Sequence, residues 1–162
     1  MSDPKARFEV MVAKLREQNF RITPQRLAIL KILSQSIGHP SVEEIYAKVK
    51  PDFPTTSLAT IYKNVSILKE MGQVLELAFS GTSSRYDGLK PYPHPHLICT
   101  QCGAIQDPDL VSLKEMKAEL MQATGYYIAH HRLDFFGLCP ECREKEKRLM
   151  AFDHENIEKK KQ

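Results

Sequence analysis

The sequence lacks the features of a membrane or secreted protein. No stretch of its 162 residues approaches the run of about 18 consecutive apolar residues that a transmembrane helix needs. Residues 1–10 contain no basic segment followed by an apolar one, so no secretory signal is visible. With 27% charged and 42% apolar residues, we expect a soluble globular protein of the cytoplasm that has no membrane partner.

Cysteine is scarce, and all four cysteines fall into two Cys-x-x-Cys pairs, Cys99/Cys102 and Cys139/Cys142. A glycine follows the first pair and a proline lies inside the second, so each pair can form a tight knuckle with two thiolates. Two disulfides are the alternative, but they need an oxidising compartment. We predict a structural Zn²⁺ held by all four sulfurs, a closed tetrahedral shell that cannot catalyse a reaction.

The spacing of the two pairs indicates what lies between them. The 36 residues from 103 to 138 exceed the roughly 15 to 20 of a compact zinc ribbon. A helix and a strand must therefore separate the two knuckles.

Excess charge is also small, and it is unevenly distributed. The net charge is +3; residues 1–88 hold 12 Lys and Arg against 9 Asp and Glu, while residues 89–162 hold 11 of each. A charge run is usually a solvated surface, so this does not prove DNA binding. It does indicate that a DNA contact would lie in the first half.

The first half reads as a winged helix that ends near Gly88. Helices are expected from apolar spacing, from Thr23-Pro24, from a capping box that begins at Ser41, and from a cap at Thr56 or Ser57. Helices are expected at 7–18, 24–38, 41–49 and 57–72. Strands are expected at 74–79 and 84–86, with a hairpin loop at 80–83.

Three prolines in residues 89–95 predict a stiff linker between two domains. Strands are expected at 96–100, 104–106 and 126–137 and a helix at 109–123, while the Lys/Glu-rich tail is expected to be a frayed helix or a disordered end. The predicted domains are a winged-helix DNA-binding domain (1–88), a zinc-binding domain (96–148) and a charged tail (149–162), which together make an α+β protein.

The fourth helix, at 57–72, has the composition of a DNA-reading helix. Leu58, Ile61, Val65 and Leu68 form one apolar stripe, and small and cationic residues lie on the opposite face, which lets the backbone approach the major groove. Arg21, which precedes the second helix, is expected to contact the minor groove. The residues expected to contact DNA are Arg21, Ser57, Ala59, Thr60, Tyr62, Lys63 and Asn64.

A second group of potential ligands is harder in character than the thiolates. His94 and His96 are two residues apart, so in an extended segment both project from the same face. Further candidates are His39, Asp87 and Asp107. This mixed nitrogen and oxygen set suits Fe(II) or Mn(II).

The chain resembles the ferric uptake regulator family over nearly its whole length. The residues that carry the resemblance are Arg21-Ile22-Thr23-Pro24-Gln25-Arg26, Gly38-His39-Pro40-Ser41, Ser57-Leu58-Ala59-Thr60-Ile61-Tyr62-Lys63-Asn64, Ser84-Arg85-Tyr86-Asp87, His94-Pro95-His96-Leu97-Ile98-Cys99 and the two cysteine pairs.

The resemblance implies a homodimeric, metal-dependent repressor that binds a palindromic operator in double-stranded DNA and dimerises through the zinc-binding domain (96–148). Its regulatory metal would be Fe²⁺ or Mn²⁺, bound by His39, Asp87, His94, His96 and Asp107. Asp107, an aspartate where iron sensors usually have glutamate, is typical of the peroxide-sensing branch. In that branch peroxide oxidises a ligand histidine, here His39 or His94, to 2-oxo-histidine.

Several alternatives stay open. One is a repressor that senses the level of iron, and another is a third, weak metal site at His131 and Glu115, although Pro95 between the two histidines cannot be a ligand. Two alternatives belong to other functional classes. One is a non-haem iron enzyme, which is disfavoured because five protein ligands leave too few open coordination positions on the metal. The other is a zinc-ribbon interaction module that does not bind DNA.

Overall fold

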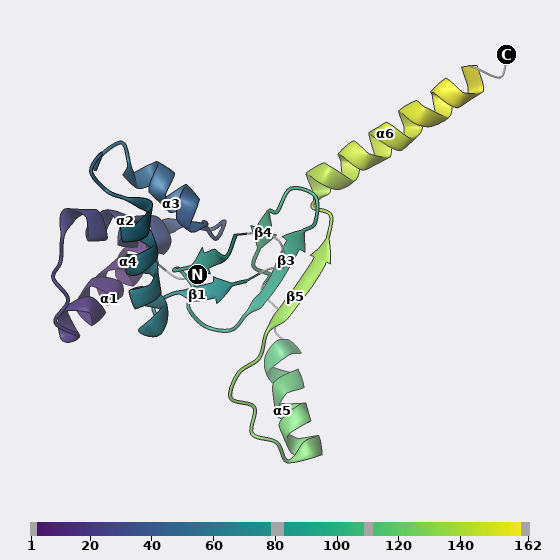
Figure 1. Cartoon of the computed structure of the whole chain (residues 1–162). Coiled ribbons are helices and arrows are strands. Elements are labelled where there is room, and N and C mark those ends of the chain that lie inside the picture. Colours follow the sequence, from purple (N-terminus) through teal and green to yellow (C-terminus); the bar gives the residue numbers. More distant parts are fainter. Residues whose placement is uncertain (1–2, 79–82, 109–111, 160–162) are drawn as a thin grey trace. The chain divides into compact units, whose positions relative to one another are not determined.

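The computed structural model of the chain describes residues 3–78, 83–108 and 112–159 (Figure 1). The chain divides into two compact units, Met1–Pro93 and His94–Gln162. This division falls within 89–95, the segment predicted to be a linker. The functions assigned to the domains stay predictions. None of the helices in the described part of the chain combines the length and apolar character needed to span a membrane.

The N-terminal unit contains four helices, each of which begins at a capping residue. Thr23 accepts a hydrogen bond from the backbone N–H of Arg26, and Ser41 and Glu44 form the predicted capping box. Ser57, not Thr56, caps the fourth helix, because its hydroxyl accepts from the N–H of Thr60. The helices are α1 (Pro4–Glu17), α2 (Pro24–Gln35), α3 (Val42–Val49) and α4 (Leu58–Glu70).

Apolar side chains from the four helices and the start of the hairpin form one core. Complete burial of each large aliphatic group stabilises the fold by about 1.5 to 3 kcal/mol. The buried members of this core are Met11, Val12, Leu15, Ile29, Leu30, Leu33, Val42, Ile45, Val49, Ile61, Val65, Leu68, Val74 and Tyr86.

The predicted stripe on α4 is wrong at one position. Leu58 is 37% exposed because it lies in the first turn of α4, whereas Ile61, Val65 and Leu68 are buried. The remaining buried position of this face is occupied by Asn64, whose amide donates to the Thr60 carbonyl at 2.7 Å. The buried face of α4 thus includes a polar group that the apolar pattern does not reveal.

A two-stranded antiparallel hairpin follows the helices. Its strands are β1 (Leu75–Leu77) and β2 (Arg85–Asp87), and Leu75 pairs with Asp87. β1 is shorter than the strand predicted at 74–79, whose last residue lies outside the described residues, as does most of the loop predicted at 80–83. β2 has the predicted length but begins and ends one residue later than predicted, so Asp87 is its last residue.

The C-terminal unit is built on a three-stranded sheet of order β4-β3-β5. Its central strand β3 is antiparallel to β4 and parallel to β5. The elements are β3 (Pro95–Cys99), β4 (Ile105–Gln106), α5 (Ser112–Thr124), β5 (Leu133–Gly137) and α6 (Pro140–Lys159). The predicted separation of the two cysteine pairs by a helix and a strand is confirmed.

Two local predictions in this unit need correction. Pro95, assigned to the linker, is the first residue of β3, a strand position where a missing backbone N–H is tolerated. Only the last five residues of the strand predicted at 126–137 are β-structure. The helix α6 begins at Pro140, inside the second cysteine pair, and continues through the charged tail to Lys159; whether this end is frayed stays a prediction.

Candidate metal centres

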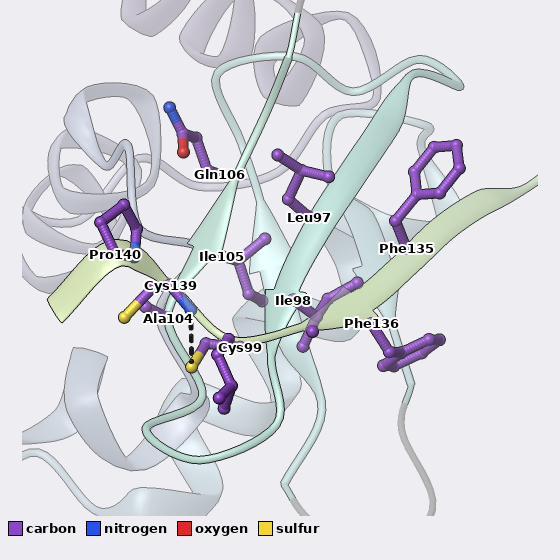
Figure 2. Close-up of a pocket in the computed structure, with 12 residues that line it drawn as sticks. Leu97, Ile98, Cys99, Ala104, Ile105, Gln106, Phe135, Phe136, Cys139 and Pro140 are labelled. Carbon is purple, nitrogen blue, oxygen red and sulfur yellow. Dashed lines mark hydrogen bonds between the residues drawn. The ribbon is translucent and has the colours of Figure 1, made fainter. Parts of the chain in front are cut away.

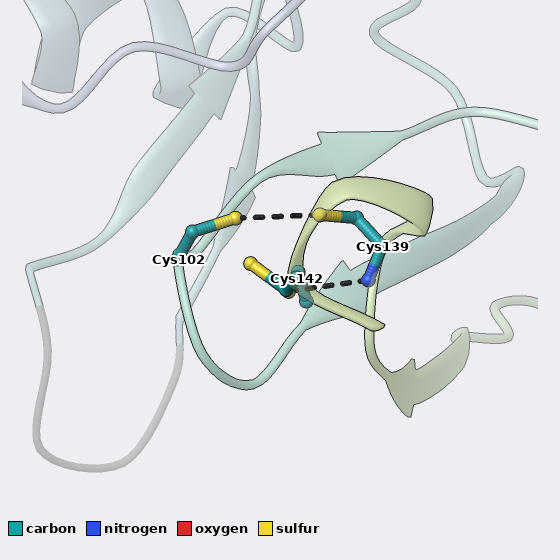
Figure 3. Close-up of side chains that lie close together, drawn as sticks. Cys102, Cys139 and Cys142 are labelled. Carbon is teal, nitrogen blue, oxygen red and sulfur yellow. Dashed lines mark hydrogen bonds between the residues drawn. The ribbon is translucent and has the colours of Figure 1, made fainter. Parts of the chain in front are cut away.

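The two cysteine pairs meet at one end of the sheet in the C-terminal unit (Figure 3). Cys99 ends β3, and Cys102 follows in a turn that Gly103 closes with a left-handed φ of 71°. Cys139 comes two residues after the end of β5, and Cys142 lies in the first turn of α6. The knuckles predicted from a glycine and a proline therefore form, one after a strand and one at the start of a helix.

The spacing of the four sulfur atoms fits a tetrahedral cation. The four Sγ atoms lie within 4.8 Å of one another, and those of Cys102 and Cys139 are 3.7 Å apart. Zn–S bonds of about 2.3 Å in a tetrahedron place sulfur atoms about 3.8 Å apart. The cluster therefore has the size of a structural zinc site with four thiolates.

The thiols of the cluster differ in acidity. Backbone N–H groups of Cys139 and Cys102 point at the Cys99 sulfur and lower the pKa of this thiol to about 6. At Cys142, hydrogen bonding with the Cys139 side chain, followed by burial, raises the pKa of the thiol to about 12. Without a cation the four groups cannot all be thiolates near neutral pH, so zinc binding must release protons.

In the N-terminal unit, His39 and Asp87 form the first pair of harder ligands. Their Nε2 and Oδ2 atoms are 3.5 Å apart, and both side chains are 1% exposed. The backbone of 38–41 runs along β2: Arg85 Nε donates to the His39 carbonyl, and the Tyr86 N–H donates to the Pro40 carbonyl. These bonds hold His39 at a left-handed φ of 51°, a conformation uncommon for residues other than glycine.

The loop after β2 orients the Asp87 carboxylate. Its Oδ1 accepts hydrogen bonds from the backbone N–H groups of Leu89 at 2.8 Å and Lys90 at 2.9 Å, so Oδ2 is directed to His39. Burial raises the pKa of Asp87, but the bonds from His39, Lys90 and Leu89 outweigh burial and lower that pKa below its usual value. Asp87 is therefore ready to act as an anionic ligand.

Arg7 fixes the same loop from α1. Its Nε donates to the Gly88 carbonyl at 2.8 Å, and its other nitrogens donate to the side chain and carbonyl of Gln73. Gly88 packs so closely on Leu33 that an added Cβ would lie 2.7 Å from the Leu33 Cβ. Arg7 could not be predicted from the sequence, because no local pattern links it to a residue 81 positions away.

In the C-terminal unit, His94, His96 and Asp107 come together at the other end of β3. Asp107 follows β4, and its Oδ2 lies 3.4 Å from His94 Nε2, while its Oδ1 lies 4.0 Å from His96 Nε2. The two imidazole rings are 4.3 Å apart between centroids. Donor atoms around one cation with bonds of about 2 Å lie about 3 to 4 Å apart, so this set fits a cation with nitrogen and oxygen ligands.

The weak third site at His131 and Glu115 stays a prediction. Glu115 is exposed on α5 and His131 is partly buried before β5. Within the described ranges, neither joins a cluster of three or more metal-ligating side chains.

The residues predicted to contact DNA lie on and around α4 and differ in exposure. Ala59, Tyr62 and Lys63 are exposed on α4, and Tyr62 donates to Glu43 at 2.9 Å. The hydroxyls of Ser57 and Thr60 are 2.9 Å apart. Asn64 is different, because it is buried and its bonds are made within the fold.

Arg26 is a second residue that the sequence analysis did not single out. Its Nε donates to Asn64 at 2.6 Å, and its Nη1 donates to the carbonyl of the exposed Arg21 at 2.6 Å. Burial lowers the pKa of Arg26. It helps to line a polar cavity of about 370 Å³ between the start of α2 and α4, together with Thr23, Gln25, Thr55, Thr56, Thr60, Lys63 and Asn64.

The sheet of the C-terminal unit carries an apolar cavity of about 350 Å³ (Figure 2). Leu97 of β3 and Phe135 and Phe136 of β5 line it and are 41%, 44% and 62% exposed. Leu97 and Phe135 are cross-strand partners on one face of the sheet, and neighbouring exposed apolar side chains of this kind mark interaction surfaces.

Comparisons with known proteins agree with these features. The model of the ferric uptake regulator family matches residues 17–136. The peroxide-responsive repressor PerR of Staphylococcus aureus (strain Mu50) is 43% identical over 137 residues, which are 85% of this chain and 92% of the relative.

Solved structures show the same fold. The Campylobacter jejuni peroxide stress regulator is 34% identical, with a TM-score of 0.65 and coverage of 81% of this chain and 98% of that one. The Helicobacter pylori ferric uptake regulator Fur is 22% identical, with a TM-score of 0.75 and coverage of 87% of this chain and 94% of that one. At this identity the similarity concerns the fold alone.

Proposed function

Because the chain belongs to the ferric uptake regulator family, we propose that it is a metal-dependent transcriptional repressor that responds to peroxide. The observation that carries this proposal is the pair of hard-ligand sets, His39 with Asp87 and His94 with His96 and Asp107. The 43% identity with a peroxide-responsive repressor supports the assignment to the peroxide-sensing branch of the family. A repressor of this kind acts on DNA, so we place it in the cytoplasm and class it as a regulator, not an enzyme.

One Fe(II) or Mn(II) bound by all five residues would join the two ligand sets. His39 and Asp87 belong to the unit that carries α4, whereas His94, His96 and Asp107 belong to the unit that carries the zinc. Ligands from both units let a single cation select one arrangement of α4 relative to the rest of the subunit. The metal and DNA would then bind cooperatively, with a coupling of about 1 to 3 kcal/mol.

The proposed DNA contact is made by the exposed face of α4. Small residues and Lys63 let this helix enter the major groove, and Arg21 lies beside it at the start of α2. Asn64 is better placed to orient Arg26 than to reach a base. A dimer would present two copies of α4 to the two halves of a palindromic operator.

The apolar cavity on the sheet is the proposed surface for the second copy of the chain. Replacing Phe135 by aspartate places a charge beside its cross-strand partner Leu97 in the lining of this cavity, so the variant is expected to be a monomer in sedimentation experiments at concentrations where the native protein is a dimer. Phe135→Leu, which keeps the side chain apolar, is the control and should stay dimeric. A Phe135→Asp variant that sediments as a dimer would exclude this surface.

The dependence of DNA binding on the regulatory metal tests the proposed function. The Mn(II)-loaded protein should bind its operator duplex about 5- to 150-fold more tightly than the protein stripped of that metal but still holding zinc. His39→Ala removes one buried ligand and should abolish most of this difference, whereas His130→Ala, at an exposed position, should preserve it. Equal affinities of the loaded and stripped native proteins would refute the proposal.

A further inference from the structure

His96 makes a contact on the side of its ring that faces away from Asp107. Its Nδ1 lies 3.3 Å from Oδ1 of Asp134, while its Nε2 lies on the side of Asp107. The side chains of His96 and Asp134 are 2% and 9% exposed. One imidazole therefore has a buried carboxylate at one nitrogen and the proposed metal position at the other.

The parallel pairing of β3 with β5 creates this contact. His96 is directly opposite Asp134 in the register, so the two side chains lie on the same face of the sheet. The same ladder ends with Cys99 opposite Gly137, next to the knuckle where the Cys139 N–H donates to the Cys99 sulfur at 3.3 Å. A shift of one residue would break both the cysteine cluster and the contact of His96 with Asp134.

Arg132 holds the carboxylate from the other side. Its Nε donates to Oδ2 of Asp134, so the two oxygens have separate partners. A carboxylate fixed in this way cannot rotate freely and keeps Oδ1 toward the imidazole.

We propose that Asp134 is a positioning residue for the regulatory metal and acts through His96. Asp134 accepts the Nδ1–H of His96, which fixes the tautomer with a proton-free Nε2, sets the plane of the ring and makes Nε2 a better donor. This inference rests on the proposed function, because it requires His96 to be a ligand. Loss of such a partner typically lowers metal affinity about 10- to 100-fold.

Titration of the zinc-loaded full chain with Mn(II), followed by the electron paramagnetic resonance signal of free Mn(II), measures the effect. Asp134→Ala should bind Mn(II) about 10- to 100-fold more weakly than the native protein. Asp134→Asn, which keeps the shape and one acceptor oxygen, should lose less. Glu119→Ala removes an exposed carboxylate from α5 and should bind as the native protein does.

A double-mutant cycle shows whether Asp134 acts through His96. If it does, Asp134→Ala should cause no further loss in a His96→Ala background. The ¹⁵N chemical shifts of His96 in the zinc-loaded protein without Mn(II) should show the proton on Nδ1, and in Asp134→Ala the proton should no longer be confined there. If Asp134 had a purely structural role, its substitution would show no coupling with His96→Ala and would not change the ¹⁵N chemical shifts of His96.

The outcomes separate the inference from the proposed function. Unchanged Mn(II) affinity in His96→Ala would refute the proposed ligand set. A weakened His96→Ala with native affinity in both Asp134 variants would refute only the positioning role. An equal loss from Asp134→Ala with and without His96 would refute it as well, since Asp134 would then act through another group.

Discussion

Replacing Cys102 by serine is expected to remove the structural zinc and unfold the C-terminal unit. Cys102 is exposed, so the substitution removes few packing contacts. A loss of zinc or of stability would therefore result from the loss of a zinc ligand. Structural zinc sites supply about 10 to 16 kcal/mol, as much as the whole stability of a typical domain, about 5 to 15 kcal/mol. The unit has little else to rely on, because its buried apolar residues in the described ranges are Ile98, Cys99, Ile105 and Cys142.

Zinc content and thermal unfolding of the full chain measure this effect. Cys102→Ser should hold almost no zinc and lose the unfolding transition of the C-terminal unit, while that of the N-terminal unit remains. Gln101→Ala, a neighbouring exposed position that offers no ligand, is the matched control and should keep both zinc and stability. A Cys102→Ser protein that stayed folded without zinc would show that the cluster does not stabilise this unit.

Exposure of the Fe(II)-loaded protein to hydrogen peroxide is expected to add the mass of one oxygen atom to the peptide that contains His39 or the one that contains His94. His39 and His94 would hold the cation, and Fe(II) bound there would supply the electrons for cleavage of peroxide, chemistry that Mn(II) does not readily support. An oxidised imidazole is a poorer ligand, so the cation and then the DNA should be released. Tandem mass spectrometry must distinguish His94 from His96, because the two are only two residues apart.

The Mn(II)-loaded protein is the control for this oxidation. It should gain no oxygen at either histidine and should keep its affinity for DNA after the same treatment. The peptide with the exposed His130 should stay unmodified in both forms. If the Fe(II) form gains no oxygen and DNA binding follows only the iron concentration, the protein is a sensor of iron level instead.

Local signals in the sequence predicted most of the helices. A helix start depends on neighbours in the chain, so Thr23 with Pro24 and Ser41 with Glu44 revealed the starts of α2 and α3. The four-cysteine cluster was equally accessible, since few arrangements accommodate two Cys-x-x-Cys pairs. The prediction that Leu58 is buried failed because burial does not depend on local signals alone. Helical periodicity gives the direction in which a side chain points, but burial also requires another element that packs against that turn of the helix.

The residues that contact the proposed metal ligands could not be predicted from the sequence. Arg7 contacts Gly88 across 81 positions, and Asp134 contacts His96 across 38, through a strand register that no local pattern encodes. Asp134 also lies in a segment where the predicted strand began seven residues too early. The ligands could be proposed from residue type and family resemblance, but their supporting partners required the tertiary structure.

The five residues of β3 impose an order on the maturation of the protein. His96 lies near the start of this strand, and Cys99, a proposed zinc ligand in the four-cysteine cluster, ends it opposite Gly137 of β5. A newly synthesised chain must therefore acquire zinc before His96 and Asp134 can meet. In a cell starved of zinc, fresh copies of the protein would stay immature whatever the supply of iron, and the genes under its control would be expressed as if an oxidant were present.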